Sequence, residues 1–88
     1  MFKADENQIK RERAKAREIR KKSWWKNKIG QGICYYCKQK FEPSTLTMDH
    51  IVPISRGGKS QKGNVVACCK ECNNKKKYLT PAEMLLYK

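Results

Sequence analysis

The chain has 88 residues, of which 39% are hydrophobic, and carries 21 lysine and arginine residues against 8 aspartate and glutamate residues. A chain of this size forms one domain at most, and a hydrophobic core alone stabilises it only marginally. No stretch is apolar and long enough to cross a bilayer or to act as a secretory signal, so we expect a cytoplasmic protein. The net charge of +13 indicates an anionic partner. Nucleic acid is the first candidate and an anionic membrane the weaker one, because Lys and Arg neutralise phosphate.

Residues 1–30 are predicted to form a basic helical arm, with 11 basic and 4 acidic side chains. From Asp5 to about Lys22 the chain is rich in helix formers and has neither Pro nor Gly. One interpretation is a solvated helix or a partly disordered tail. The interpretation that we favour is an arm that grips phosphates and orders fully on nucleic acid. Its candidate phosphate contacts are Lys10, Arg11, Arg13, Arg17, Arg20 and Lys21.

Apolar residues are sparse in this arm. Ile9, Ala16 and Ile19 follow one helical stripe, which is too narrow to predict firm burial. We expect Trp24 and Trp25 to anchor the arm to the rest of the chain, because exposed tryptophans are costly without a partner. Stacking of these rings on bases is the alternative.

Four of the five cysteines are spaced as metal ligands. Cys34-x-x-Cys37 and Cys69-x-x-Cys72 each place two thiols in a tight turn, and in a reducing cytoplasm such pairs are more often metal ligands than disulfides. Four thiolates predict a closed, tetrahedral structural zinc site. A redox dithiol fits poorly, because there are two copies and no βαβ pattern. The fifth cysteine, Cys68, is expected to be a small buried hydrophobic residue.

Between the two cysteine pairs the sequence predicts a β-hairpin, followed by a helix. A strand that starts at residue 46 leads into Asp49-His50, and residues 65–67 return antiparallel to it after a loop with Pro53 and two glycines. A helix is expected from about 69 to 77. Adjacent residues of a strand point to opposite faces, but at a strand end Asp49 and His50 could both approach one phosphate.

The end of the chain predicts one more helix. Thr80-Pro81-Ala82-Glu83 has the form of a capping box with proline at the first helical position. We expect Met84, Leu85 and Tyr87 to cover the zinc domain.

These motifs together resemble the HNH endonuclease family over about residues 34–80. The pattern is Asp-His-Ile-x-Pro, then Gly-Gly, then Asn-Val-x-x-x-Cys-x-x-Cys-Asn with lysines following. The resemblance implies a small α+β fold, a ββα-metal (treble-clef-like) zinc domain over 31–88, with the basic arm over 1–30. The third signature position is often His in the family and is Asn73 here, as in H-N-N variants that remain active nucleases.

The resemblance also implies a role for each signature residue. His50 is the general base that takes a proton from water, for which its near-neutral pKa is suited. Asp49 and Asn73 offer oxygens to a divalent cation, and such ligands suit Mg²⁺ or Mn²⁺. Asn64 hydrogen-bonds loop backbone and holds the strand of His50 in place. Two further candidate phosphate contacts are Arg56 and Lys76.

The implied function is metal-dependent hydrolysis of DNA phosphodiester bonds by a bacterial or phage-type endonuclease with low sequence specificity. Such cleavage leaves 5′-phosphate and 3′-hydroxyl ends. One alternative is a zinc-stabilised module that binds nucleic acid without cutting it, and another is the nuclease subunit of a phage packaging complex with a partner protein. Asp49, His50 and Asn73 favour the enzyme, because a binding module needs neither a base nor two oxygen ligands.

Overall fold

The computed structural model describes residues 3–77 and 79–86. Its elements, in chain order, are α1 (Glu6–Ile19), α2 (Ser23–Gly30), the 3-10 turn η1 (Pro43–Thr45), β1 (Thr47–His50), the 3-10 turn η2 (Ile54–Arg56), β2 (Val65–Cys68), α3 (Lys70–Lys76) and α4 (Pro81–Leu86). Five residues lie outside the described ranges, namely 1 and 2 of the predicted arm and 78, 87 and 88 of the predicted zinc domain. None of the helices in the described ranges has the length and apolar character needed to cross a membrane.

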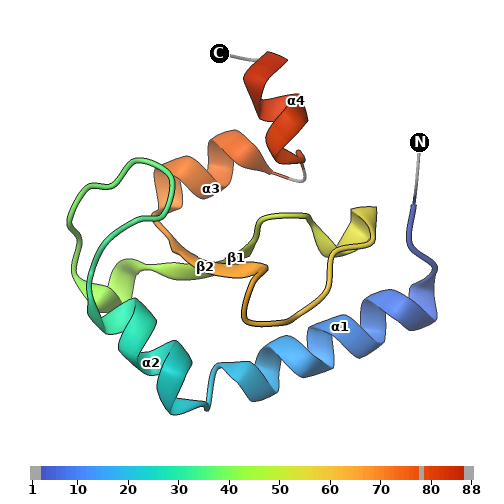
Figure 1. Ribbon diagram of the computed structural model, residues 1–88, viewed down its shortest axis with the longest axis horizontal. Helices are drawn as coiled ribbons and strands as arrows, with labels where there is room; N and C mark the ends of the chain where they lie inside the picture. The colour runs from blue at the N-terminus through green and yellow to red at the C-terminus, as the bar shows by residue number, and fades with distance from the viewer. Residues whose placement is uncertain (1–2, 78, 87–88) are drawn as a thin grey trace.

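The centre of the molecule is the predicted antiparallel hairpin. β1 pairs with β2 so that Thr47 faces Cys68 and His50 faces Val65. All four residues of β2 are buried, which requires cover on both faces of the sheet. Figure 1 shows the hairpin between α1 on one side and α3 on the other. The order β1, β2, α3 confirms the predicted ββα arrangement and the small α+β class.

The hydrophobic core joins the N-terminal helices to the hairpin and the cysteines. Its buried members are Ile19, Trp25, Cys34, Leu46, Val65, Ala67, Cys68 and Cys69. Trp25 is only 4% exposed, and Trp24 packs against the same cluster, so the tryptophan pair anchors the N-terminal helices as expected. Burial of apolar area of this kind is the main favourable contribution to folding.

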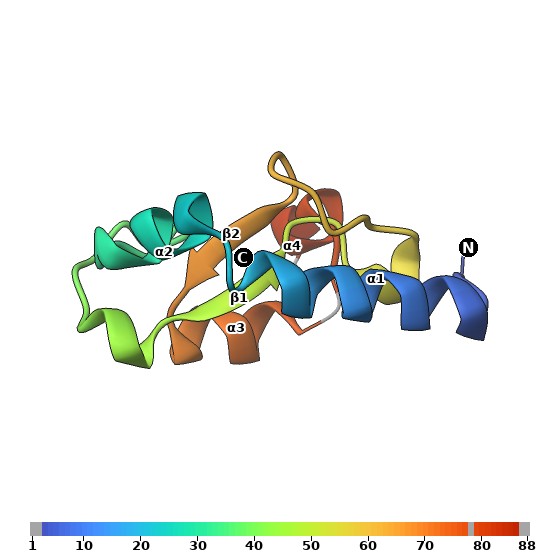
Figure 2. The ribbon, with the colours of Figure 1, turned by 90° about the horizontal axis from the view of Figure 1, so that it is seen from below.

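The predicted arm over 1–30 contains two helices: α1 lies within the predicted range 5–22, and α2 follows it. Asp5 caps α1, accepting a hydrogen bond from the Gln8 N–H at 2.8 Å, but the helix ends at Ile19 and the extended Lys22 precedes α2. Ile19 and Trp25 are six residues apart and would lie on different faces of one continuous helix. The turn between the helices brings both into one core, as the change in chain direction in Figure 2 illustrates.

Two of the three apolar residues in the narrow stripe of α1 are buried, contrary to expectation, and the third, Ile9, is half-buried. Ala16 is 3% and Ile19 is 8% exposed, and Glu12 on the same face is 2% exposed. These positions are three and four residues apart, so they form one continuous contact face. The central residue of this contact face is Glu12, so counting apolar residues alone underestimated how far the helix is buried.

The last helix begins as predicted. Glu83 accepts a hydrogen bond from the Thr80 N–H at 2.9 Å, and the Glu83 N–H donates to Thr80 Oγ1 at 3.4 Å, which forms the capping box. Leu85 is 68% exposed and therefore does not cover the zinc domain. Met84 is half-buried, and Tyr87 lies outside the described residues.

Candidate active site

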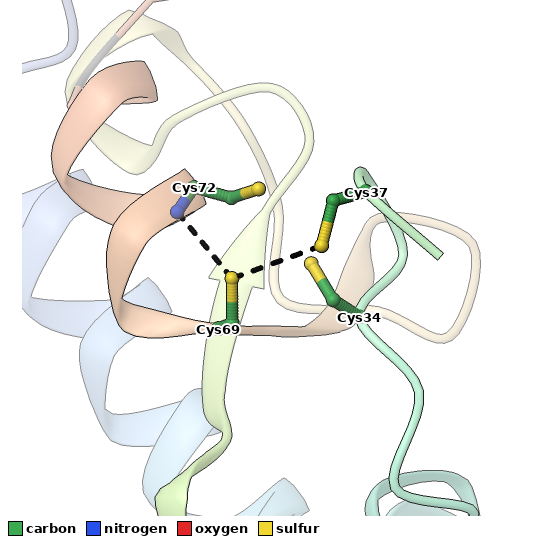
Figure 3. Close-up of side chains that lie close together, drawn as sticks. All are labelled: Cys34, Cys37, Cys69 and Cys72. Carbon is green, nitrogen blue, oxygen red and sulfur yellow. Dashed lines mark hydrogen bonds between the residues drawn. The ribbon is translucent and has the colours of Figure 1, made fainter. Parts of the chain in front are cut away.

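The four predicted zinc ligands converge. Cys34 and Cys37 lie in the turn after α2, whereas Cys69 and Cys72 lie at the start of α3, and Figure 3 shows the four thiols pointing toward a common centre. Their sulfur atoms all lie within 4.8 Å of one another, and Cys37 Sγ is 4.0 Å from Cys69 Sγ. A tetrahedral zinc ion with bonds of about 2.3 Å separates its sulfur ligands by about 3.8 Å. The cluster therefore fits a structural zinc ion with four thiolate ligands.

Local structure favours the thiolate form at one of the four candidate ligands, Cys34. Burial raises the pKa of Cys34, but backbone N–H groups of Cys37, Cys69 and Tyr36 donate to its sulfur and bring that pKa down to about 6. The Cys69 sulfur caps α3 by accepting the Cys72 N–H at 3.5 Å. Cys68 is fully buried outside the cluster, and burial raises its pKa to about 12, so it is the inert buried thiol that was predicted.

The loop after β1 is held by Asn64. Its Oδ1 accepts the Val52 N–H at 2.9 Å, and its Nδ2 donates to the carbonyl oxygens of Val52 at 3.1 Å and Lys59 at 2.9 Å. Gly58 is required in the same loop, because a side chain there would collide with the backbone of Val52 and Pro53. These contacts fix the path of the chain directly after His50.

Asp49 is a buried carboxylate with two partners. Tyr36 donates its hydroxyl hydrogen to Asp49 Oδ2 at 2.6 Å, and the Lys76 ammonium lies 3.3 Å from the same oxygen. Burial and the bond to Asp49 raise the pKa of Tyr36, so the phenol stays protonated and donates. Both contacts use Oδ2.

His50 lines two cavities at the end of β1. A cavity of about 230 Å³ is lined by Arg13, Met48, Asp49, His50, Pro53, Ile54, Ser55, Lys76 and Lys77. A second cavity, of about 370 Å³, is lined by Arg13, Ala16, Arg17, Arg20, Met48, His50 and Ile54. Because His50 is the last residue of β1, it and Asp49 reach one cavity from successive positions, as expected at a strand end.

The surroundings of His50 favour its neutral form. Burial lowers the pKa of His50 below the ordinary 6.5, and the cations Arg20 and Lys76 add to that effect while Asp49 opposes it. A neutral imidazole at pH 7 is able to accept a proton. A base beside a carboxylate and several cations is an arrangement suited to reactions at a phosphate group.

The structure separates the predicted basic contacts into two groups. Lys10, Arg11, Arg13, Arg17, Arg20 and Lys21 are exposed along and just beyond α1. Arg13, Arg17 and Arg20 are four and three residues apart, so they share one helix face, and this face lines the cavities beside His50. The sequence did not reveal that the predicted arm forms one wall of the site.

Two of the predicted phosphate contacts are engaged within the protein instead. The Lys76 side chain is fully buried and donates to the His50 carbonyl oxygen at 2.9 Å besides pairing with Asp49. Arg56 binds both carboxylate oxygens of Glu83, at 2.8 and 3.2 Å. A charge with an acidic partner inside the fold is not offered to a phosphate, so this geometry does not support those two contacts.

Asn73 lies on α3 but does not line the cavity of Asp49 and His50. Its Nδ2 donates to Thr47 Oγ1 at 3.4 Å. Thr47 and Asp49 are two residues apart in β1, so their side chains point to the same face of the strand. Asn73 and Asp49 consequently lie on the side of β1 that α3 covers.

Sequence reasoning missed three polar residues of the site, Glu12, Ser60 and Tyr36. Ser60 Oγ lies 2.9 Å from His50 Nε2, and Glu12 accepts hydrogen bonds from Ser60. The one available signal was the position of Glu12, four residues before Ala16 and seven before Ile19, on the face predicted to be apolar. No spacing rule links Ser60 or Tyr36 to the histidine.

Comparison with known proteins identifies the family that the chain matches. A family model described as HNH endonuclease matches residues 34–85. The chain is also 41% identical over 44 residues to the CRISPR-associated endonuclease Cas9 of Actinomyces naeslundii, a match that covers 49% of this chain. It spans 4% of the length of that protein.

Proposed function

Because this chain belongs to the HNH endonuclease family, we propose that it is a metal-dependent endonuclease that hydrolyses DNA phosphodiester bonds. The observation that carries the proposal is the position of His50. It lines one cavity together with Asp49 and Arg13, and a second cavity together with Arg13, Arg17 and Arg20. A base, an acidic ligand and phosphate-binding cations thus occur together.

His50 would take a proton from the attacking water, and the lowered pKa of its ring supports this role because the neutral form is populated at pH 7. Asp49 Oδ1 and the amide oxygen of Asn73 would hold a divalent cation, and hard oxygen donors suit Mg²⁺ or Mn²⁺. When bound, such an ion stabilises the negative charge that develops on the phosphate and on the leaving oxygen. The family implies a divalent metal of this kind.

The exposed basic face of α1 would hold the DNA backbone. Arg13, Arg17 and Arg20 line the cavities beside His50, so phosphates bound there would pass close to the base. Contacts to phosphate carry no direct sequence information. We therefore propose low sequence specificity.

The second candidate is a zinc-stabilised module that binds nucleic acid without cutting it. One observation favours it: Lys76 already neutralises the Asp49 carboxylate. If that ion pair persists on DNA, Asp49 has no need of a metal ion. The endonuclease would require divalent cations and His50 for cleavage, whereas the binding module would require neither for binding nucleic acid.

Nicking of supercoiled plasmid by zinc-loaded protein tests the proposal. We expect nicking with added Mg²⁺ or Mn²⁺ and none without them, and a loss of about 10²- to 10⁴-fold in His50→Ala, because a general base contributes that much. Gln61→Ala is the matched control, since Gln61 is exposed in the same loop. Zinc content and circular dichroism must be unchanged. Plasmid that is retarded in gels but remains uncut with each metal would instead favour the binding module.

A further inference from the structure

Two residues outside the recognised motif join α1 to the active-site loop. Glu12 Oε1 accepts the Ser60 N–H at 2.6 Å, and the Glu12 carbonyl oxygen accepts the Ser60 hydroxyl at 2.6 Å. Glu12 is 2% and Ser60 is 8% exposed. Two short, buried bonds between residues 48 positions apart fix Ser60 relative to α1, because a buried polar group that loses its partner is costly.

The same serine determines which nitrogen of His50 carries hydrogen. Ser60 Oγ lies 2.9 Å from His50 Nε2. A hydroxyl has one hydrogen, and a backbone carbonyl only accepts, so the Ser60 hydrogen points to Glu12. The Ser60 oxygen must then accept from His50, which places the hydrogen on Nε2 and leaves Nδ1 unprotonated.

We propose that Ser60, held by Glu12 of α1, is the positioning residue that fixes the His50 ring with Nδ1 as the proton-accepting atom. The catalytic part of this inference rests on the proposed nuclease function. It makes α1 part of the catalytic apparatus, because the helix that presents the arginines also sets the base. Undocking of α1 would release Ser60 and with it the histidine.

The kinetic test compares Ser60→Ala with Ser60→Thr and with Ser44→Ala, a control at an exposed serine in η1. We expect kcat for plasmid nicking to fall about tenfold to a hundredfold in Ser60→Ala, because part of the general-base contribution is lost. KM and zinc content should stay unchanged, since Ser60 does not touch DNA or the cysteines. Ser60→Thr keeps the hydroxyl and should restore most of kcat.

A spectroscopic test reports on the ring directly, and it is simple because His50 is the only histidine of the chain. In ¹⁵N-labelled protein we expect a slowly exchanging Nε2–H resonance in the wild type and in Ser44→Ala, and its loss in Ser60→Ala. The proposal is overturned if Ser60→Ala keeps either this resonance or the wild-type kcat. If the wild type itself fails to nick DNA, the proposed function fails, while the resonance still decides whether Ser60 holds His50.

Discussion

Glu12 is a charged residue at the centre of a packing contact, and this makes its protonation part of the stability of the fold. The Ser60 N–H donates to its carboxylate, and this bond lowers the pKa of Glu12 below the ordinary 4.5 although burial opposes the effect. Lys15, 3.4 Å from the carboxylate, adds to the lowering. A carboxyl with a lower pKa in the folded than in the unfolded state stabilises the protein above the unfolded pKa.

We therefore expect Glu12→Gln to be less stable than the wild type at pH 7 by about 1 kcal/mol, because the neutral amide oxygen accepts a weaker hydrogen bond than the carboxylate does. The difference should narrow as the pH falls below 4.5, because the wild-type carboxylate is then protonated. Urea unfolding in excess zinc at several pH values measures both free energies of unfolding. Glu18→Gln is the control, since the Glu18 side chain is 69% exposed; a Glu12→Gln difference that is constant with pH would contradict the argument.

At the scale of single elements, α1 carries two groups of basic residues that differ in position. Arg13, Arg17 and Arg20 line the cavities beside His50, whereas Lys10 and Arg11 do not line them. Each phosphate neutralised by a protein cation contributes about 0.9 to the slope of log affinity against log salt for duplex DNA. The two groups should therefore differ in DNA binding as well as in position.

In a His50→Ala background, which removes the proposed base, we expect Arg17→Gln with Arg20→Gln to weaken duplex binding and to lower the salt slope by about 1.8. Lys10→Gln with Arg11→Gln changes the net charge equally and should lower the slope by less. Fluorescence anisotropy of a labelled duplex at several salt concentrations measures both. Equal losses in the two double variants would indicate that net charge alone attracts the DNA. They would contradict a specific role for Arg17 and Arg20 in binding.

The sequence predicted those elements whose signals are local. The hairpin, the helix after Cys69 and the Glu83 capping box follow from alternation, spacing and end residues, and each is present. The docking of α1 was not predictable, because its central contact is a carboxylate whose partner is a backbone N–H 48 residues away. The burial of Lys76 on Asp49 was not predictable for the same reason, because a lysine after a cysteine pair gives no local sign of burial. The catalytic roles of Asp49, His50, Asn64 and Asn73 stay predictions.

At the scale of the whole molecule, the metal cluster and the hydrophobic core are one structure. Cys34 and Cys69 belong both to the group of candidate ligands and to the core that includes Trp25 and Val65. An 88-residue chain with 39% hydrophobic residues has little stability in reserve, because domains of this size are stable by only about 5–15 kcal/mol. Structural zinc contributes about 10–16 kcal/mol of binding free energy in small zinc domains. A bound zinc ion would therefore contribute a free energy as large as the whole net stability of a typical domain.

We expect removal of zinc to unfold the protein rather than merely to inactivate it. A strong chelator should abolish the tertiary signal of the two tryptophans, since Trp25 is buried against the cysteine cluster, and added Mg²⁺ should restore neither signal nor activity because it binds thiolates poorly. Cys72→Ser should behave like the chelated protein. Cys68→Ala is the matched control, because Cys68 is buried outside the cluster: it should keep one zinc ion per chain and lose only the stability of a small cavity. If the zinc-free protein kept its tryptophan signal, the hairpin, α1 and the core would be stable on their own, and the metal would serve the site alone.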